Sequence, residues 1–359
     1  MSYSGSTHAL GACSPSSILG TPTGDKIFYA TAPDTMYNKR MKDAILSFPQ
    51  QFAYRPQINN AGSFKPRKEF VVAGMGGSHL AADLITMWRP EAPLIIHSDY
   101  GLPNLPKDKL KNSLIIANSY SGNTEETLSA FHAARKLKIP LIAVSTGGKL
   151  LALAKKHGVP YIETPGGKTE PRAAIGFNFM ALLKAIGRNK DISLAAKLEK
   201  QLSPEKEESA GEKIAKAIGK KSLIIYSSGR NYPLAYNWKI NMNETAKSPA
   251  FADVFPELNH NEMNAFAAKA AKQPEFYFLI LRSGEDYSRT QARMAVLKRL
   301  LKDRSWPVEE IYLGKSGTLK DVFQNVLLSM WNSTYIAEEK KIDPDKTPII
   351  EEFKRLISE

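Results

Sequence analysis

The sequence of 359 residues contains a single cysteine, Cys13, and this scarcity restricts its chemistry. One thiol cannot form an intrachain disulfide, a CxxC redox pair or a zinc cluster of cysteines. The sequence also lacks an apolar run near the roughly 18 residues that cross a bilayer, and its N-terminus lacks a basic segment followed by an apolar core. We therefore expect a cytoplasmic protein in a reducing compartment, with no membrane partner.

Acidic residues are fewer than basic ones, 36 against 49, which gives a net charge of +13. Such an excess attracts anions and would suit nucleic acid as well as a phosphorylated metabolite. The lysines, however, are scattered at helical spacing among glutamates, without the interleaved aromatic residues that stack on bases. This pattern is typical of solvated helix faces, so we expect no nucleic-acid partner.

Short apolar runs alternate with helical segments from residue 70 onward, which predicts parallel sheets with helices on their faces. The first set of predicted strands covers residues 70–74, 93–97, 113–118, 140–145 and 160–164, with helices at 77–88, 123–138, 149–157 and 173–187. The pattern then starts again, with strands at 222–228, 275–281 and 307–313 and helices at 232–247, 286–303 and 318–339. The fold class is therefore α/β with two units in tandem.

Composition divides the chain into four parts. Residues 1–65 form an N-terminal extension, which is rich in Ser, Gly and Pro at its start and carries one helix from Asp34 to about Gln51. The two α/β units cover residues 66–190 and 191–340, near the usual size of a domain. Residues 341–359 form a tail helix, whose packing face has Ile349, Ile350, Phe353 and Ile357.

Two turns each follow a predicted strand and lead into a predicted helix. The first contains Gly74, Gly76 and Gly77, and the second is the stretch SYSGNT at residues 119–124. Glycines before a helix let backbone amides approach an anion at the helix N-terminus. Several neutral donors hold a phosphate monoester without a lysine or a metal. The alternative is that Ser121 and Asn123 cap the helix together with Glu126.

Two kinds of nucleotide site are alternatives to this cradle. A dinucleotide fold would use the first turn, with Asp99 as its ribose-binding acid. Its third glycine, however, would fall on His79, and SYSGNT would have no purpose. A P-loop is excluded because neither turn carries GK[ST].

These turns, GMGGSHLAADL and SYSGNTEETL, resemble the sugar isomerase (SIS) domain. The tandem arrangement resembles the bifunctional phosphoglucose/phosphomannose isomerases, and further matches follow in order: DYGLP at 99–103, EPRAAIG at 170–176, NETAK at 243–247, PELNHNE at 256–262 and FKRL at 353–356. The resemblance implies two SIS domains, a phosphosugar substrate, no cofactor and a homodimer. It also implies that a phosphate binds at Gly77, Ser78, Ser119, Ser121 and Thr124.

The resemblance implies the remaining site residues as well. Glu244 would be the proton-transferring base, and Arg172 would hold oxygens near C1 and C2. His260 would open the sugar ring, reaching across to the partner subunit. Lys354 would lie near the ring oxygen and Thr347 would accommodate mannose, so that the tail helix completes the active site.

Glu244 and Arg172 have plainer interpretations from the sequence alone. Glu244 would form a helical ion pair with Lys247, and Arg172 would be a loop charge exposed to water. The other histidines, His8, His79, His97, His132 and His157, are interpreted as surface or hydrogen-bonded residues, and no two have the spacing of metal ligands.

Two departures from the family pattern concern substrate range, namely Thr245 in place of Asn and His79 in place of a small residue. The resemblance implies an isomerase that interconverts glucose 6-phosphate, and mannose 6-phosphate as a second aldose, with fructose 6-phosphate. The alternatives are an isomerase of another phosphosugar, a non-catalytic SIS regulator that binds a sugar phosphate, and an NAD-dependent dehydrogenase.

Overall fold

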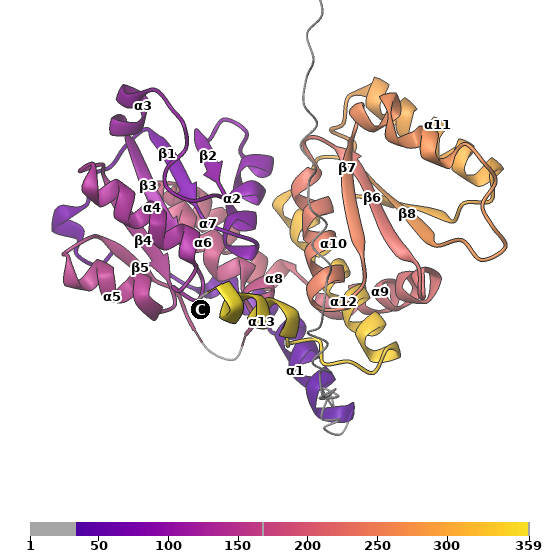
Figure 1. The fold of residues 1–359 in the computed structure, drawn as a ribbon, viewed down its shortest axis with the longest axis horizontal. Helices are drawn as coiled ribbons and strands as arrows, with labels where there is room; N and C mark the ends of the chain where they lie inside the picture. Colours follow the sequence, from indigo (N-terminus) through magenta and orange to yellow (C-terminus); the bar gives the residue numbers. More distant parts are fainter. Residues whose placement is uncertain (1–33, 167–168, 358–359) are drawn as a thin grey trace, which may run out of the picture. The chain divides into compact units, whose positions relative to one another are not determined.

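The computed structural model describes residues 34–166 and 169–357 (Figure 1). The Ser, Gly and Pro-rich start of the predicted N-terminal extension, with Cys13 and His8, lies outside the described residues. No helix in the described part of the chain is long and apolar enough to cross a membrane.

Within these residues, the first sheet has five parallel strands in the order β2-β1-β3-β4-β5. The strands are β1 Glu69–Ala73, β2 Leu94–His97, β3 Ser113–Asn118, β4 Leu141–Ser145 and β5 Tyr161–Glu163. The helices of this half are α2 Gly77–Trp88, α3 Lys107–Asn112, α4 Glu125–Lys136, α5 Gly148–Lys156 and α6 Ile175–Ala185. These elements confirm the predicted α/β arrangement.

Alternation along the strands places apolar side chains on both faces of the first sheet. Val72 and Ile116 belong to the core that includes α2 and α6, whereas Val71 and Ile115 face the core made by α4 and α5. Because all five strands are parallel, their carboxyl ends meet at one edge. The two predicted turns lie at that edge.

The second sheet has four parallel strands in the described chain, in the order β7-β6-β8-β9. They are β6 Ser222–Ser228, β7 Ala250–Phe255, β8 Phe276–Arg282 and β9 Val308–Tyr312. Sequence analysis did not predict β7. This edge strand leaves Phe251 exposed and carries Asp253, so its sequence AFADVF lacks the apolar run that marks the other strands.

The remaining α-helices link and cover the sheets. They are α1 Asp34–Leu46, α7 Asn189–Ala195, α8 Leu198–Gln201, α9 Pro204–Ile218, α10 Tyr232–Glu244, α11 Ser288–Asp303, α12 Leu319–Glu339 and α13 Pro348–Ile357. The predicted helix from Asp34 to about Gln51 is wrong at its end, because a separate 3₁₀ helix, η1 Phe48–Ala53, follows α1 and carries Pro49 in its first turn.

Part of the predicted N-terminal extension belongs to the core. Phe48 and Phe52 of η1 are fully buried, and both rings contact Phe323 of α12. Phe179 of α6 packs edge to face against the same ring, with 5.2 Å between centroids. Aromatic residues from η1, α6 and α12 therefore form one cluster, so this extension is not merely an appendage.

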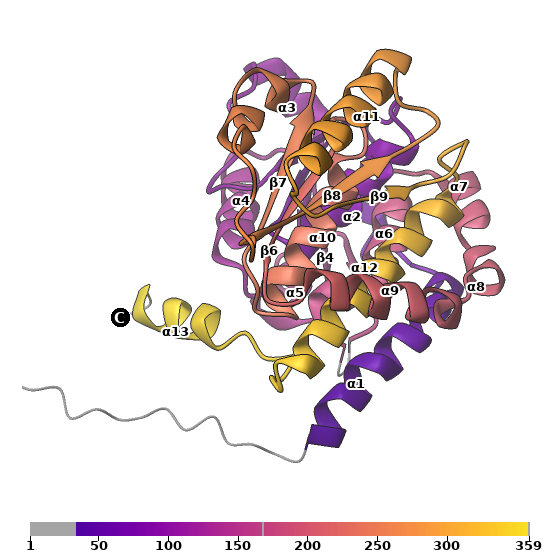
Figure 2. The ribbon, with the colours of Figure 1, turned by 90° about the vertical axis from the view of Figure 1, so that its right-hand side faces the viewer.

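The expected packing of the tail helix is wrong within the described chain. The apolar side chains of α13 are exposed, with Ile349 at 77%, Phe353 at 61% and Ile357 at 54%. The segment before α13 is held by Arg172 and Lys247, and from there the helix projects away from the two sheets (Figure 2). The amphipathic sequence forms the predicted helix, but the apolar face of this helix is not buried.

Candidate active site

The two turns of the first half are joined by hydroxyl groups. Ser78, in the first turn of α2, accepts a hydrogen bond at 3.1 Å through its Oγ from the backbone N–H of Tyr120. In the second turn, the Oγ of Ser119 lies 2.8 Å from the Oγ1 of Thr124 and accepts the N–H of Gly122 at 3.1 Å. The structure thus brings Ser78, Ser119 and Thr124 to one edge of the sheet.

Gly122 is required for the shape of the second turn. Its φ is +70°, a conformation that side chains disfavour, and a Cβ atom there would lie 1.9 Å from the carbonyl oxygen of Gly147. Only glycine therefore lets this turn pack against the loop after β4. That close packing shapes the segment on which Ser121 and Thr124 lie.

The capping alternative for the second turn is wrong. The N-cap of α4 is Thr124, and neither α4 nor α2 has a side-chain cap hydrogen bond in the described chain. Asn123 instead accepts the N–H of Lys149 through its Oδ1, and Ser121 is exposed. Two helix N-termini without side-chain caps lie beside these hydroxyls, an arrangement suited to an anion.

Arg172 contacts Glu244 directly. The Nη1 of Arg172 lies 3.3 Å from the Oε2 of Glu244, and its Nε donates to the Oγ1 of Thr245 at 2.9 Å. Its Nη2 donates to the backbone carbonyls of Pro344 and Asp345 at 2.5 and 3.1 Å. Arg172 is only 3% exposed, so the interpretation of it as a loop charge in water is wrong.

The expected ion pair of Glu244 with Lys247 is also wrong. The Nζ of Lys247 donates to backbone carbonyls, those of Glu244 at 2.8 Å, Thr245 at 3.3 Å and Asp343 at 2.6 Å. Burial, with the nearby charge of Arg172, lowers the pKa of Lys247 to about 8. The hydrogen bond to Asp343 was not predicted because Asp343 is far away in the chain and no local pattern marks the contact.

The turn that precedes α2 and the Arg172–Glu244 pair adjoin each other. A Cβ atom at Gly77 would lie 3.3 Å from the carbonyl oxygen of Pro171 and 3.6 Å from the Cα of Arg172. Tyr120, in the second turn, donates through its hydroxyl to the carbonyl of Thr169, three residues before Arg172. The two turns and a buried cation beside a carboxylate thus occupy one region.

The two departures from the family pattern have structural roles. Thr245 is buried and accepts the Nε–H of Arg172. His79 lies 2.6 Å through its Nδ1 from the Oδ2 of Asp83 and stacks on Tyr236. Thr245 therefore orients Arg172, and His79 is a hydrogen-bonded residue at the contact of α2 with α10.

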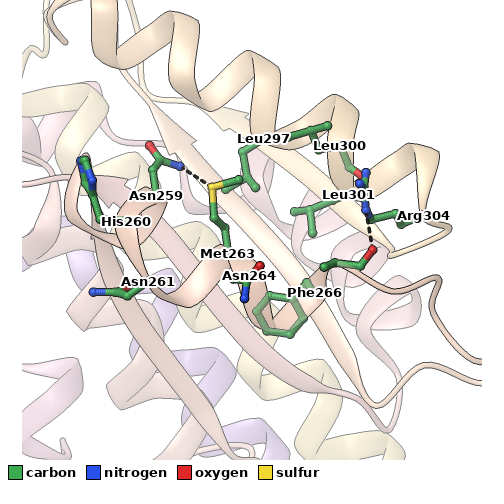
Figure 3. A pocket seen from close by; sticks show the side chains of 11 residues that line it. Asn259, His260, Asn261, Met263, Asn264, Phe266, Leu297, Leu300, Leu301 and Arg304 are labelled. Carbon is green, nitrogen blue, oxygen red and sulfur yellow. Dashed lines mark hydrogen bonds between the residues drawn. The ribbon is translucent and has the colours of Figure 1, made fainter.

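Within one chain, His260 lies at a different place from Glu244. It ends the 3₁₀ helix η4 Glu257–His260, is exposed, and lines a cavity of about 540 Å³ (Figure 3). Figure 3 shows His260 at one end of this cavity and Arg304 at the other, with Met263 between them. Neither Arg172 nor Glu244 lines the cavity. Among the described residues, His260 has no hydrogen bond or ion pair with either of them.

The structure does not bury the predicted tail residues in the site. Lys354 is exposed on α13, where its Nζ lies 2.9 Å from the Oε1 of Glu351. Thr347 is half-buried and accepts the N–H groups of Ile350 and Glu351 at the start of α13. Only the preceding segment, at Pro344 and Asp345, reaches Arg172.

Metal ligands are not gathered anywhere in residues 34–166 and 169–357, because no group of three or more His, Cys, Asp or Glu side chains there is placed to hold an ion.

Comparison with known proteins places the chain in a family. Residues 207–357 match the model described as the bacterial phospho-glucose isomerase C-terminal SIS domain. A protein of Caldicellulosiruptor bescii named bifunctional phosphoglucose/phosphomannose isomerase is 31% identical over 340 residues, covering 89% of this chain and 99% of its own. A protein of the same name from Thermoplasma volcanium is 33% identical over 310 residues, covering 85% and 97%.

A solved structure shows the same fold. The protein described as glucosamine-6-phosphate deaminase from Thermotoga maritima superposes with a TM-score of 0.61 at 15% identity, covering 87% of this chain and 97% of its own. The two sheets correspond to two SIS-like domains, and the resemblance drawn from the motifs is confirmed. The chain belongs to the family of bifunctional phosphoglucose/phosphomannose isomerases.

Proposed function

We propose that this protein interconverts glucose 6-phosphate, and mannose 6-phosphate as a second aldose, with fructose 6-phosphate, without a cofactor. The observation that carries the proposal is the contact of buried Arg172 with Glu244 beside the two hydroxyl-lined turns. A carboxylate and a cation next to an anion cradle suit proton transfer on a phosphorylated sugar. The reaction belongs to glycolysis and gluconeogenesis.

The proposed roles follow the geometry. The hydroxyls of Ser78, Ser119, Ser121 and Thr124, with the backbone at Gly77, hold the phosphate. Glu244 takes the proton from C2 of the open-chain aldose, and the C–H electron pair becomes the C1–C2 double bond of an enediolate with its charge on O1.

Glu244 then returns the proton to C1, while the hydroxyl proton of O2 moves to O1, which gives the ketose. Because C2 is planar in the enediolate, glucose and mannose configurations share this intermediate. Arg172 stabilises the charge that develops on the two oxygens.

The remaining residues are proposed to act through assembly. We propose a homodimer in which His260 serves the site of the partner subunit, since within one chain it lines a separate cavity. We also propose that α13 moves onto the site and brings Lys354 and Thr347 with it, since its apolar face is exposed. The domain limits at residues 66–190 and 191–340, and a cytoplasmic location, belong to the same proposal.

An enzyme-linked assay tests the activity. Fructose 6-phosphate formed from glucose 6-phosphate and from mannose 6-phosphate is measured separately, with glucosamine 6-phosphate as a third substrate. Turnover of the first two supports the proposal. Turnover of another phosphosugar alone would indicate a different isomerase, and binding without turnover would indicate an SIS regulator.

A further inference from the structure

The second half repeats the strand-turn-helix arrangement of the first, and the proposed reaction makes no use of the turns in this repeat. Residues 229–231 join β6 to α10, and residues 283–287 join β8 to α11. β6 and β8 are neighbouring parallel strands, as β1 and β3 are in the first sheet. The two turns therefore meet at the carboxyl edge of the second sheet, as the phosphate turns do in the first.

The side chain of Asp286 occupies this meeting point. Its Oδ1 accepts hydrogen bonds from the Oγ of Ser228 at 2.5 Å and the Nδ2 of Asn231 at 2.9 Å, and its Oδ2 accepts the backbone N–H of Ser283 at 2.7 Å. None of these four residues is more than 8% exposed. Neutral donors from both turns thus enclose a carboxylate.

The turn contributed by β8 differs from its counterpart in the first half by its charge. The six residues after β3 are SYSGNT, with no carboxylate, whereas the six after β8 are SGEDYS. Glu285 pairs with Arg230 of the facing turn at 2.5 Å, which fixes the loop that carries Asp286. Asn231 is the N-cap of α10, so the partial positive charge of that helix also favours an anion here.

We propose that the second half contains an oxyanion site that the chain closes with its own carboxylate. Asp286 stands where a phosphate group would bind, and its negative charge repels a phosphate dianion. A tethered carboxylate also has the advantage of high effective concentration over a free ligand. The chain therefore binds one sugar phosphate rather than two, and loss of this carboxylate opens a site for inorganic phosphate.

The test removes the carboxylate and supplies inorganic phosphate. Asp286→Ala leaves the Ser228 hydroxyl and the Ser283 amide without their acceptor and removes one of two acceptors of the Asn231 amide, so its melting temperature should fall below that of the parent. With 5-phosphoarabinonate saturating the first half, inorganic phosphate at ten times its dissociation constant should raise the melting temperature of this variant by about 2 °C. The melting temperature of the parent protein should not rise with phosphate. Chloride at equal ionic strength is the control for an effect of salt on both proteins.

Asp286→Asn is the matched control, because its amide still fills the site and should prevent the phosphate response. A folded Asp286→Ala protein that responds no more than the parent would overturn the proposal, as would an equal response of Asp286→Asn.

If Asp286→Ala does not fold, calorimetry on the parent protein tests the proposal by measuring phosphate binding. With 5-phosphoarabinonate present we expect no uptake, and one phosphate per chain that disappears in Ser228→Ala would overturn the proposal. Both tests measure phosphate binding and not isomerase turnover. Failure of the proposed reaction can therefore be distinguished from failure of this proposal.

Discussion

Arg172 and Glu244 form an ion pair of 3.3 Å although 72 residues separate them in the chain. The same guanidinium also binds Thr245 and the backbone carbonyls of Pro344 and Asp345. The candidate base, the end of α10 and the segment that leads to α13 are therefore held by one buried cation.

Glu244→Gln should lower isomerase turnover about 10,000-fold, because the amide keeps the shape of the side chain but cannot accept the proton from C2. Affinity for 5-phosphoarabinonate should change by less than about 1 kcal/mol, since the phosphate contacts remain. Turnover and calorimetric affinity are measured together. Glu339→Gln, at an exposed position at the end of α12, is the control. Turnover within a few-fold of the parent would remove Glu244 as the base.

Arg172→Met should lower both turnover and stability. Four hydrogen-bond acceptors lose their donor, two of them buried carbonyls, and we expect a loss of about 2–3 kcal/mol in the free energy of unfolding. Arg172→Lys keeps the charge but lacks the planar fork, so it should recover stability only in part. Urea unfolding of the parent and both variants measures the difference, and equal stability of all three would contradict the described contacts.

Ser121→Ala combined with Thr124→Ala should raise the KM for glucose 6-phosphate roughly 100-fold, because two hydrogen bonds to a charged group are lost. The kcat should change much less, since these contacts are present in the ground state and the transition state alike. Ser193→Ala, an exposed hydroxyl on α7, provides the control. A fall in kcat at constant KM would argue against a phosphate cradle.

Lys247 predicts a pH dependence of stability. Its pKa is lowered to about 8 in the folded protein, against about 10.4 for an ordinary lysine. Between these values the unfolded chain binds the proton and the folded chain does not, so the contribution of Lys247 to the free energy of unfolding rises with pH.

The stability of the parent relative to Lys247→Met should therefore increase from pH 8 to pH 10 in urea unfolding. Lys190→Met, on the exposed side of α7, controls for the loss of one positive charge. A difference between parent and Lys247→Met that falls over this range would contradict the lowered pKa.

Mixing the inactive Glu244→Gln and His260→Ala proteins should restore activity if His260 acts across a dimer. Random exchange makes half of the dimers mixed, and each mixed dimer keeps one intact site, so about a quarter of the parental activity should return. Native mass spectrometry verifies subunit exchange. Exchange without recovered activity would show that each site is built from one chain.

Local patterns in the sequence determined the elements and the position of the turns. Apolar runs such as SLIIAN and SLIIYSS specify buried parallel strands, and the Gly-rich and hydroxyl-rich stretches that follow such strands lie at the carboxyl edge of the first sheet. These strands and turns depend on residues that are neighbours in the chain, so they can be predicted without knowledge of the fold. β7 was not predicted from the sequence because an edge strand needs little apolar character.

The tertiary structure alone decided which charges meet. Sequence proximity favoured Lys247 as the partner of Glu244, but folding buries Arg172 beside that carboxylate and turns Lys247 toward the carbonyl of Asp343. Likewise, the spacing of Ile349 and Phe353 specifies an amphipathic helix. Whether its apolar face is buried depends on the path of the preceding segment, and here that face is exposed. Periodicity is a property of adjacent residues, whereas the partner of a side chain depends on contacts between distant segments that no local pattern encodes.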